Sequence, residues 1–154
     1  MRVGAVTLAV ALSAALTGCG MQIPADPDGT LDRVRGGELR AGATASGELV
    51  TVQGDEVGGT LTALVEEYAE SVDAHVVWTV DSEEDLVAGL EDGDLDLAIG
   101  GMTAATPWAE QVGVTRGYTG IPGSGGASVV MLLPMGENAW LASLETFLDA
   151  EVGP

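Results

Sequence analysis

The order of helix-like and strand-like patterns between Gly89 and Tyr118 restricts the fold of this chain most. A helical pattern ends near Gly93, an apolar strand pattern runs from Leu95 to Ile99, and a polar turn leads to a helix start at Thr106. A short apolar run bounded by turn residues predicts a buried strand. Helix, strand, turn and helix in this order are typical of an α/β protein, which builds ligand sites from such turns.

The rest of the chain continues the alternation. Strand patterns lie at 39–43, 75–80 and 129–133, and helical patterns lie at 60–72, 82–90 and 140–148. Strands separated by single helices favour a parallel sheet with right-handed crossovers. The length is enough for one domain and too short for two. We therefore expect an α/β fold: a single three-layer domain at 30–150, in which helices flank a small, mostly parallel sheet.

The N-terminus has the pattern of an export signal. Arg2 precedes an uncharged, mostly apolar run, and Leu16-Thr17-Gly18-Cys19 fits the lipobox of bacterial lipoproteins. We expect a lipoprotein signal peptide at 1–18, a lipidated Cys19 and a flexible tether at 19–29. Acyl chains on the cysteine would anchor the protein on the outer face of the cytoplasmic membrane, in an extracytoplasmic location.

The charge of the chain excludes one class of partner. There are 24 acidic residues against five basic ones, all arginine, which gives a formal net charge of -19. Nucleic acid is not an expected partner, because a phosphate backbone requires a basic surface. An anionic membrane surface would also repel the domain, so the lipid has to hold it there.

Two turns are candidates for a ligand site. In open parallel sheets, ligands collect at the carboxyl ends of the strands, where the turns after Ala43 and Ile99 should lie. In the second turn, Gly100 and Gly101 allow close approach to the backbone, and Thr103 offers a hydroxyl. Thr106-Pro107 fits the N-cap and first position of a helix, whose free N–H groups attract anions. The alternative is a tight turn and a helix cap with no ligand.

The same segment resembles the ligand-cradling segment of the family 3 extracellular solute-binding proteins, the receptors of polar amino-acid importers. The matching residues are Leu90, Gly93, Asp96, Gly101, Met102, Thr103, Thr106, Pro107, Ala109, Gln111, Val112, Thr115 and Tyr118. The resemblance implies one lobe of a type II periplasmic binding protein fold, with an antiparallel last strand. It makes Gly101, Met102, Thr103 and Thr106 candidate ligand-binding residues. Ser46 is a further candidate because it lies in the first turn, and Trp108 is one because its ring could stack on a ligand, with packing against the domain or contact with a partner as the alternative.

The chain departs from this family in two respects. The family commonly has an arginine just after the Thr-Pro pair that grips the ligand carboxylate, whereas here Trp108 and Ala109 follow Pro107. Arg116 is nearby in sequence and is at least as well explained as a surface residue. Where the family builds a second lobe, this chain has a Gly-rich loop at 117–128. The resemblance therefore describes a first lobe only.

Other chemistries find little support. His75 is the single histidine and has no cysteine or second histidine to form a metal site or a catalytic pair. Asp92, Asp94 and Asp96 imitate the start of a calcium loop, but Leu97 stands where glycine is required. We interpret these aspartates as a solvated entrance to the strand. No enzyme, metal or cofactor is expected.

Two functions remain open. The first is a membrane-anchored extracytoplasmic solute-binding lipoprotein of a transporter system, which recognises a small polar solute such as an amino acid and works with a permease. The second is a surface interaction or regulatory module that keeps the fold but has lost ligand capture. In that case a groove around Trp108 and Tyr118 would be the docking face.

Overall fold

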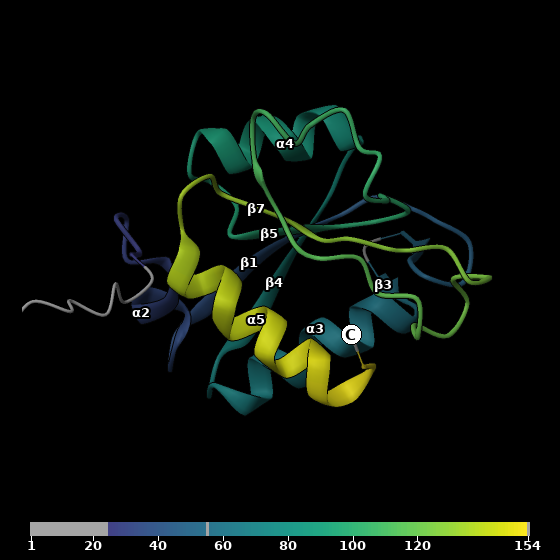
Figure 1. Cartoon of the computed structure of the whole chain (residues 1–154), viewed down its shortest axis with the longest axis horizontal. Helices are drawn as coiled ribbons and strands as arrows, with labels where there is room; N and C mark the ends of the chain where they lie inside the picture. The colour runs from purple at the N-terminus through teal and green to yellow at the C-terminus, as the bar shows by residue number, and fades with distance from the viewer. Residues whose placement is uncertain (1–24, 55, 154) are drawn as a thin grey trace, which may run out of the picture.

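The computed structural model describes residues 25–54 and 56–153 (Figure 1). The predicted signal peptide, Cys19 and the first part of the predicted tether lie outside the described residues. In the described part, no helix is long and apolar enough to cross a membrane.

The chain forms a five-stranded sheet, a small hairpin and four helices within the described ranges. In chain order these are α2 (Thr30–Val34), β1 (Glu38–Ala43), β2 (Thr51–Gln53), β3 (Glu56–Gly58), α3 (Thr60–Ser71), β4 (His75–Val80), α4 (Glu83–Glu91), β5 (Leu97–Ile99), β6 (Gly113–Val114), β7 (Leu132–Leu133) and α5 (Asn138–Glu151). The sheet order is β4-β1-β5-β7-β6, and β2 pairs with β3.

Strand directions agree with the expectation from sequence. The central strand β1 pairs in parallel with β4 and with β5, whereas β7 runs antiparallel to both β5 and β6. Parallel neighbours need a crossover, and here α3 and α4 supply it. The prediction of a mostly parallel sheet with an antiparallel last strand is confirmed.

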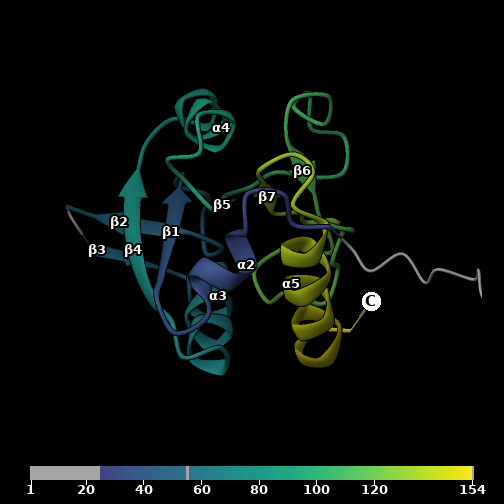
Figure 2. The same cartoon turned by 90° about the vertical axis from the view of Figure 1, so that its left-hand side faces the viewer.

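Helices cover both faces of the sheet, which gives three layers (Figures 1 and 2). On one face, α3 and α5 share the larger core cluster with Leu39, Ala41 and Ala43 of β1. On the other face, α4 contributes Leu86 and Leu90 to a second cluster. The helix α4 begins as predicted, because Ser82 Oγ accepts the N–H of Asp85 at 3.2 Å.

The prediction of a helix that starts at Thr106 is wrong. Residues 107–111 form turns in which the Trp108 carbonyl accepts the N–H groups of Gln111 and Val112. The physical reason is length: the chain returns to the sheet as β6 at Gly113, which leaves too few residues for a stable helix. The candidate site therefore has no helix N-terminus at Thr106.

Candidate functional site

Three parallel strands end side by side and bring the predicted turns together. The N–H of Thr44, just after β1, donates to the carbonyl of Ile99 at 3.0 Å. The N–H of Asp81, just after β4, donates to the carbonyl of Ala43 at 3.2 Å. We call the turns at 44–46 and 100–106 the carboxyl-edge site. The structure thus confirms the position that the sequence predicts for these turns.

Ser46 and Gly101 meet at this edge. A Cβ atom placed on Gly101 would lie 2.5 Å from the Ser46 Oγ, so a side chain at position 101 would push the serine hydroxyl out of its present position. Glycine at position 101 lets the hydroxyl lie against the backbone. Ser46 is held by its own turn, in which its N–H donates to the Val50 carbonyl at 2.8 Å. A partly exposed hydroxyl is thereby placed directly beside an exposed glycine backbone.

The two threonines of the second turn are partly exposed and shape it. The Thr103 Oγ1 accepts the N–H of Ala105 and the Thr106 Oγ1 accepts the N–H of Trp108, both at a long 3.4 Å. The Thr103 carbonyl also accepts the N–H of Thr106 at 2.9 Å. Bonds of 3.4 Å are weak, so both hydroxyls keep hydrogen-bonding capacity for another molecule.

Met102 and Trp108 take different positions from those expected of ligand-binding side chains. Met102 is 3% exposed and packs in the cluster beneath α4, so its side chain points into the core rather than to the open edge. Trp108 is half-buried against the same cluster, and its Nε1–H donates to Glu83 Oε1 at 2.6 Å. This bond ties the second turn to the first turn of α4.

The docking face predicted around Trp108 and Tyr118 does not form. Tyr118 is 0% exposed, and its hydroxyl donates to Asp149 Oδ1 of α5 at 3.1 Å. Burial and this carboxylate raise the pKa of Tyr118, which keeps the phenol neutral. Tyr118 is a core residue that joins the last part of the sheet to α5.

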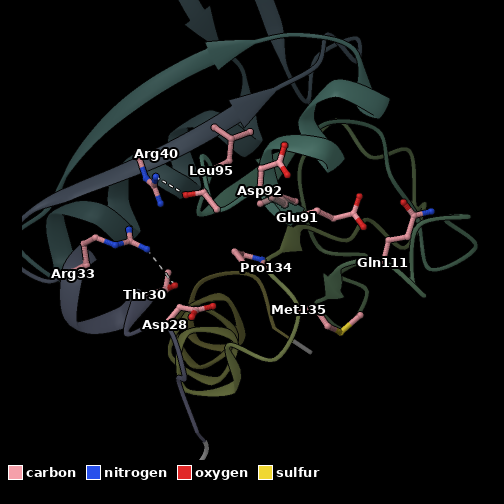
Figure 3. Close-up of a pocket in the computed structure, with 12 residues that line it drawn as sticks. Asp28, Thr30, Arg33, Arg40, Glu91, Asp92, Leu95, Gln111, Pro134 and Met135 are labelled. Atoms are coloured by element: carbon pink, nitrogen blue, oxygen red, sulfur yellow. Dashed lines mark hydrogen bonds between the residues drawn. The ribbon is translucent and has the colours of Figure 1, made fainter.

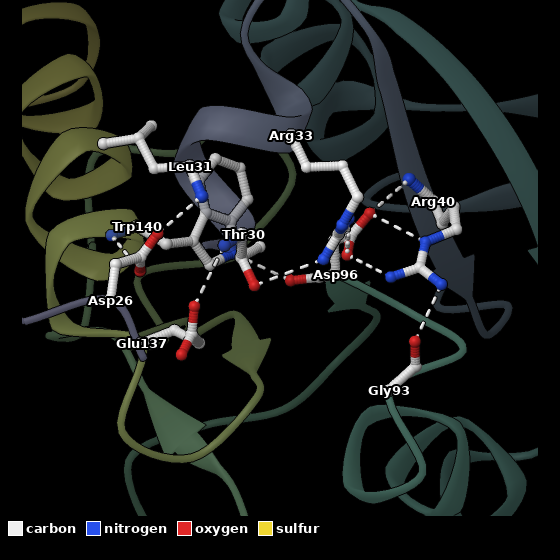
Figure 4. A network of polar contacts seen from close by, with 9 residues as sticks. All are labelled: Asp26, Thr30, Leu31, Arg33, Arg40, Gly93, Asp96, Glu137 and Trp140. Atoms are coloured by element: carbon white, nitrogen blue, oxygen red, sulfur yellow. Dashed lines mark hydrogen bonds and ion pairs between the residues drawn. The ribbon is translucent and has the colours of Figure 1, made fainter. Parts of the chain in front are cut away.

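The prediction of a solvated strand entrance is wrong for Asp96, which is 0% exposed (Figure 4). Its Oδ1 accepts Arg33 Nη1 at 2.7 Å and Arg40 Nη2 at 2.6 Å. Its Oδ2 accepts the Arg40 backbone N–H at 2.9 Å and Nε at 3.1 Å. Burial raises the pKa of Asp96, but the hydrogen bonds from Arg40 and Arg33 outweigh it, and the net pKa lies below the usual value.

A pair of carboxylates, Glu137 and Asp26, joins the start of the domain to α5 (Figure 4). Glu137, 2% exposed, accepts the N–H groups of Asp28 and Thr30 at 3.0 and 3.1 Å. Asp26 accepts the N–H of Leu31 at 2.7 Å and that of Trp140 at 3.2 Å. These bonds satisfy free donors at the starts of α2 and α5. Residues 26–28 are therefore held on the domain, which begins before the predicted boundary at residue 30.

A cavity of about 490 Å³ lies beside this network, at the amino end of β1 (Figure 3). Its wall includes Arg33, Arg40, Leu95 and Met135. Both guanidinium groups already bind Asp96, and Arg40 Nη1 also donates to the Gly93 carbonyl at 2.7 Å. The positive charge of this cavity is thus engaged in holding the fold. Among the described residues, no group of three or more His, Cys, Asp or Glu side chains is placed to hold a metal ion.

Sequence comparison finds no matching family model and no matching curated protein. Among solved structures, the arginine-bound form of domain 1 from TmArgBP superposes with a TM-score of 0.66 at 18% identity, over 77% of this chain and 97% of that chain. A point mutant of the same domain gives a TM-score of 0.67 at 18% identity, over 79% and 97%. An ABC uptake transporter substrate-binding protein from Streptococcus pneumoniae with bound histidine gives 0.53 at 20% identity, over 62% and 39%.

At sequence identities of 18 to 20%, these superpositions show that the fold is shared. The superposition with domain 1 from TmArgBP spans nearly all of that domain. The protein is therefore a single mixed α/β domain, with a mostly parallel sheet flanked by helices, and it has the fold of a periplasmic binding protein lobe.

Proposed function

We propose that this protein is a membrane-anchored extracytoplasmic solute-binding lipoprotein that recognises a small polar solute, such as an amino acid, at the carboxyl-edge site. The observation that carries the proposal is the meeting of Ser46 with Gly101 where β1 and β5 end. Open sheets of this type bind ligands outside the carboxyl ends of their strands. The hydroxyls of Ser46 and Thr103 can each donate to and accept from a polar solute.

A single lobe can bind a solute, although more weakly than a closed pair of lobes. Deep sites bury about 70 to 90% of a ligand, so a solute on one open edge keeps more water contact and binds more weakly. Domain 1 from TmArgBP is described as arginine-bound although it is one domain, which supports solute binding by a lone lobe in the present protein. A permease of a transport system is the membrane partner that we propose.

The hydroxyl of Thr103 provides the direct test. In calorimetric titrations of the mature protein in detergent against amino acids and other small polar solutes, we expect saturable binding of at least one solute. Replacing Thr103 with valine should weaken that binding about tenfold, because the isosteric change removes a hydrogen bond and leaves its partner on the solute unpaired.

Thr79→Val is the matched control, since Thr79 is an exposed β4 residue with the same side chain. The Thr79→Val variant should bind the same solute with the affinity of the wild type. Unchanged affinity in Thr103→Val would remove Thr103 from the site, and a complete absence of binding across the solute panel would end the solute-receptor proposal.

The lipid anchor needs a separate test, because Cys19 lies outside the described residues. We expect the wild-type protein in the membrane fraction of cells and Cys19→Ser in the soluble fraction, since two acyl chains are needed for stable anchoring. Membrane and soluble fractions would be compared by immunoblot. Membrane retention of Cys19→Ser would contradict the anchor.

A further inference from the structure

The strand β4 forms one outer edge of the sheet (Figure 2). Within residues 25–54 and 56–153, β4 pairs only with β1. The N–H of His75 donates to the Gly37 carbonyl at 3.0 Å, on the side of β1. Backbone groups alternate in direction along a strand, so the N–H and C=O groups of Val76, Trp78 and Val80 point away from β1. This side of β4 therefore offers backbone donors and acceptors that no described strand uses.

The composition of β4 does not protect this edge. Proteins usually protect a free sheet edge with lysine, proline or a bulge. The sequence of β4, HVVWTV, contains neither lysine nor proline, and its pairing with β1 is regular over its whole length. Val77 and Val80 are 41% and 43% exposed, and Met135 is the only other large apolar side chain exposed in the described part. The edge is therefore both unpaired and apolar.

A groove of about 350 Å³ lies beside this edge, between β4 and α3. Val76 and Trp78 line it from β4, and Glu66 and Glu70 line it from α3. Both glutamates are exposed, and neither takes part in an ion pair with another described residue. Unpaired carboxylates beside a groove favour an occupant with positive charge.

We propose that the free edge of β4 binds an extended, basic segment of a partner protein, which pairs with β4 as an additional strand. In this mode of recognition, main-chain hydrogen bonds give affinity and alternate side chains give specificity. Every second side chain of the added strand faces the groove, where Lys or Arg meets Glu66 and Glu70. The side chains between them lie on the face of Val77. A second copy of this chain is disfavoured, because two molecules with a net charge of -19 repel each other.

Designed peptides test this pairing. The fluorescein-labelled peptide KVKVKVKV has the required alternation, and we expect a saturable rise in its fluorescence anisotropy with the mature protein in non-ionic detergent. KVKPPKVK carries the same charge, but its adjacent prolines remove one N–H donor from each side of the strand, so it should not bind. EVEVEVEV should not bind either, because its charge is opposite.

The backbone contact is tested at Val80. Val80→Pro removes one outward N–H at a position where an edge strand tolerates proline, and KVKVKVKV should bind at least about fivefold more weakly. Val80→Ala keeps the N–H and shortens an exposed side chain, so its affinity should change by less than about twofold. Far-UV circular dichroism would check that both variants fold.

The charge contact is tested at α3. The double variant Glu66→Gln/Glu70→Gln should bind KVKVKVKV about fivefold more weakly, since two surface ion pairs are lost. Glu91→Gln/Glu110→Gln is the matched control: both glutamates are exposed and neither lines the groove, and the change in net charge is the same. Its affinity should not change.

These experiments leave the carboxyl-edge site untouched, so the inference and the proposed function can fail separately. Absence of saturable binding of KVKVKVKV would overturn the inference. Equal binding of KVKPPKVK, or equal losses in the two double variants, would show attraction by overall charge without strand pairing and would also overturn it. A concentration-dependent dimer in sedimentation, lost in Val80→Pro, would assign the edge to a second copy instead of a basic partner.

Discussion

Replacing Asp96 with alanine should lower the free energy of unfolding by about 3 kcal/mol. The carboxylate is fully buried and accepts four hydrogen bonds from Arg33 and Arg40. Its removal leaves two guanidinium groups and a backbone N–H without their acceptor. Broken buried ion pairs cost about 3 to 5 kcal/mol, and the lower value applies because both arginines still reach water.

Urea unfolding followed by far-UV circular dichroism would measure this loss. Asp94→Ala is the matched control, because Asp94 is an exposed aspartate two residues earlier and should change the stability by less than about 0.5 kcal/mol. Similar losses in the two variants would contradict the assignment of Asp96 as the anchor of this end of the sheet.

The pH dependence of the unfolding free energy tests whether the negative charge of Asp96 causes this stabilisation. Because the folded-state pKa of Asp96 is lowered, its stabilisation is complete above the unfolded pKa and is lost as the pH falls through the folded pKa. The difference in unfolding free energy between the wild type and Asp96→Asn should therefore stay constant from neutral pH down to about pH 4 and shrink below it. A difference that already shrinks between pH 7 and pH 5 would contradict this account.

Elements with a clear period could be predicted from the sequence. The β-branched pattern at 75–80 and the capped helix after Ser82 form as expected, since local propensity and burial agree there. The two turns of the candidate site could also be located, because parallel strands place their carboxyl ends at one edge. The first inference depends on neighbours in sequence, and the second depends on a general rule for parallel sheets.

The Asp96 network joins residues that are far apart in sequence, so it could not be predicted from local sequence patterns. Asp92, Asp94 and Asp96 look alike in sequence, yet only the third is buried, because it precedes a strand that is covered on both faces. A polar residue next to the fully apolar run 97–99 was the available signal. Its partners Arg33 and Arg40 lie 63 and 56 residues away, beyond any local pattern.

The surroundings of the second turn were harder to predict for a similar reason. Thr106-Pro107 is a good helix start, but the return of the chain to the sheet at Gly113 overrides that preference. Tyr118 and Met102 could equally have faced solvent or core in a segment with no clear period. In the structure both side chains are buried in the core.

Trp140→Ala should destabilise the protein by about 3 to 5 kcal/mol, as expected when a fully buried tryptophan is truncated. Trp140 is 0% exposed, and its ring packs edge-to-face against that of Tyr68, with the ring centroids 5.3 Å apart. Its Nε1–H donates to the Asp96 carbonyl at 2.8 Å. The substitution therefore creates a cavity between α3 and α5 and also leaves a buried carbonyl unpaired.

Guanidinium unfolding followed by far-UV circular dichroism would measure the effect without relying on tryptophan fluorescence. Leu141→Ala, the next residue of α5, is only partly buried and should cost clearly less. Equal losses at the two positions would mean that α5 packs less tightly than described.

Because Trp140 and Asp96 bond directly, the double variant Asp96→Ala/Trp140→Ala should lose less stability than the two single losses combined. Strict additivity would show that the closing helix and the Asp96 network stabilise the domain independently.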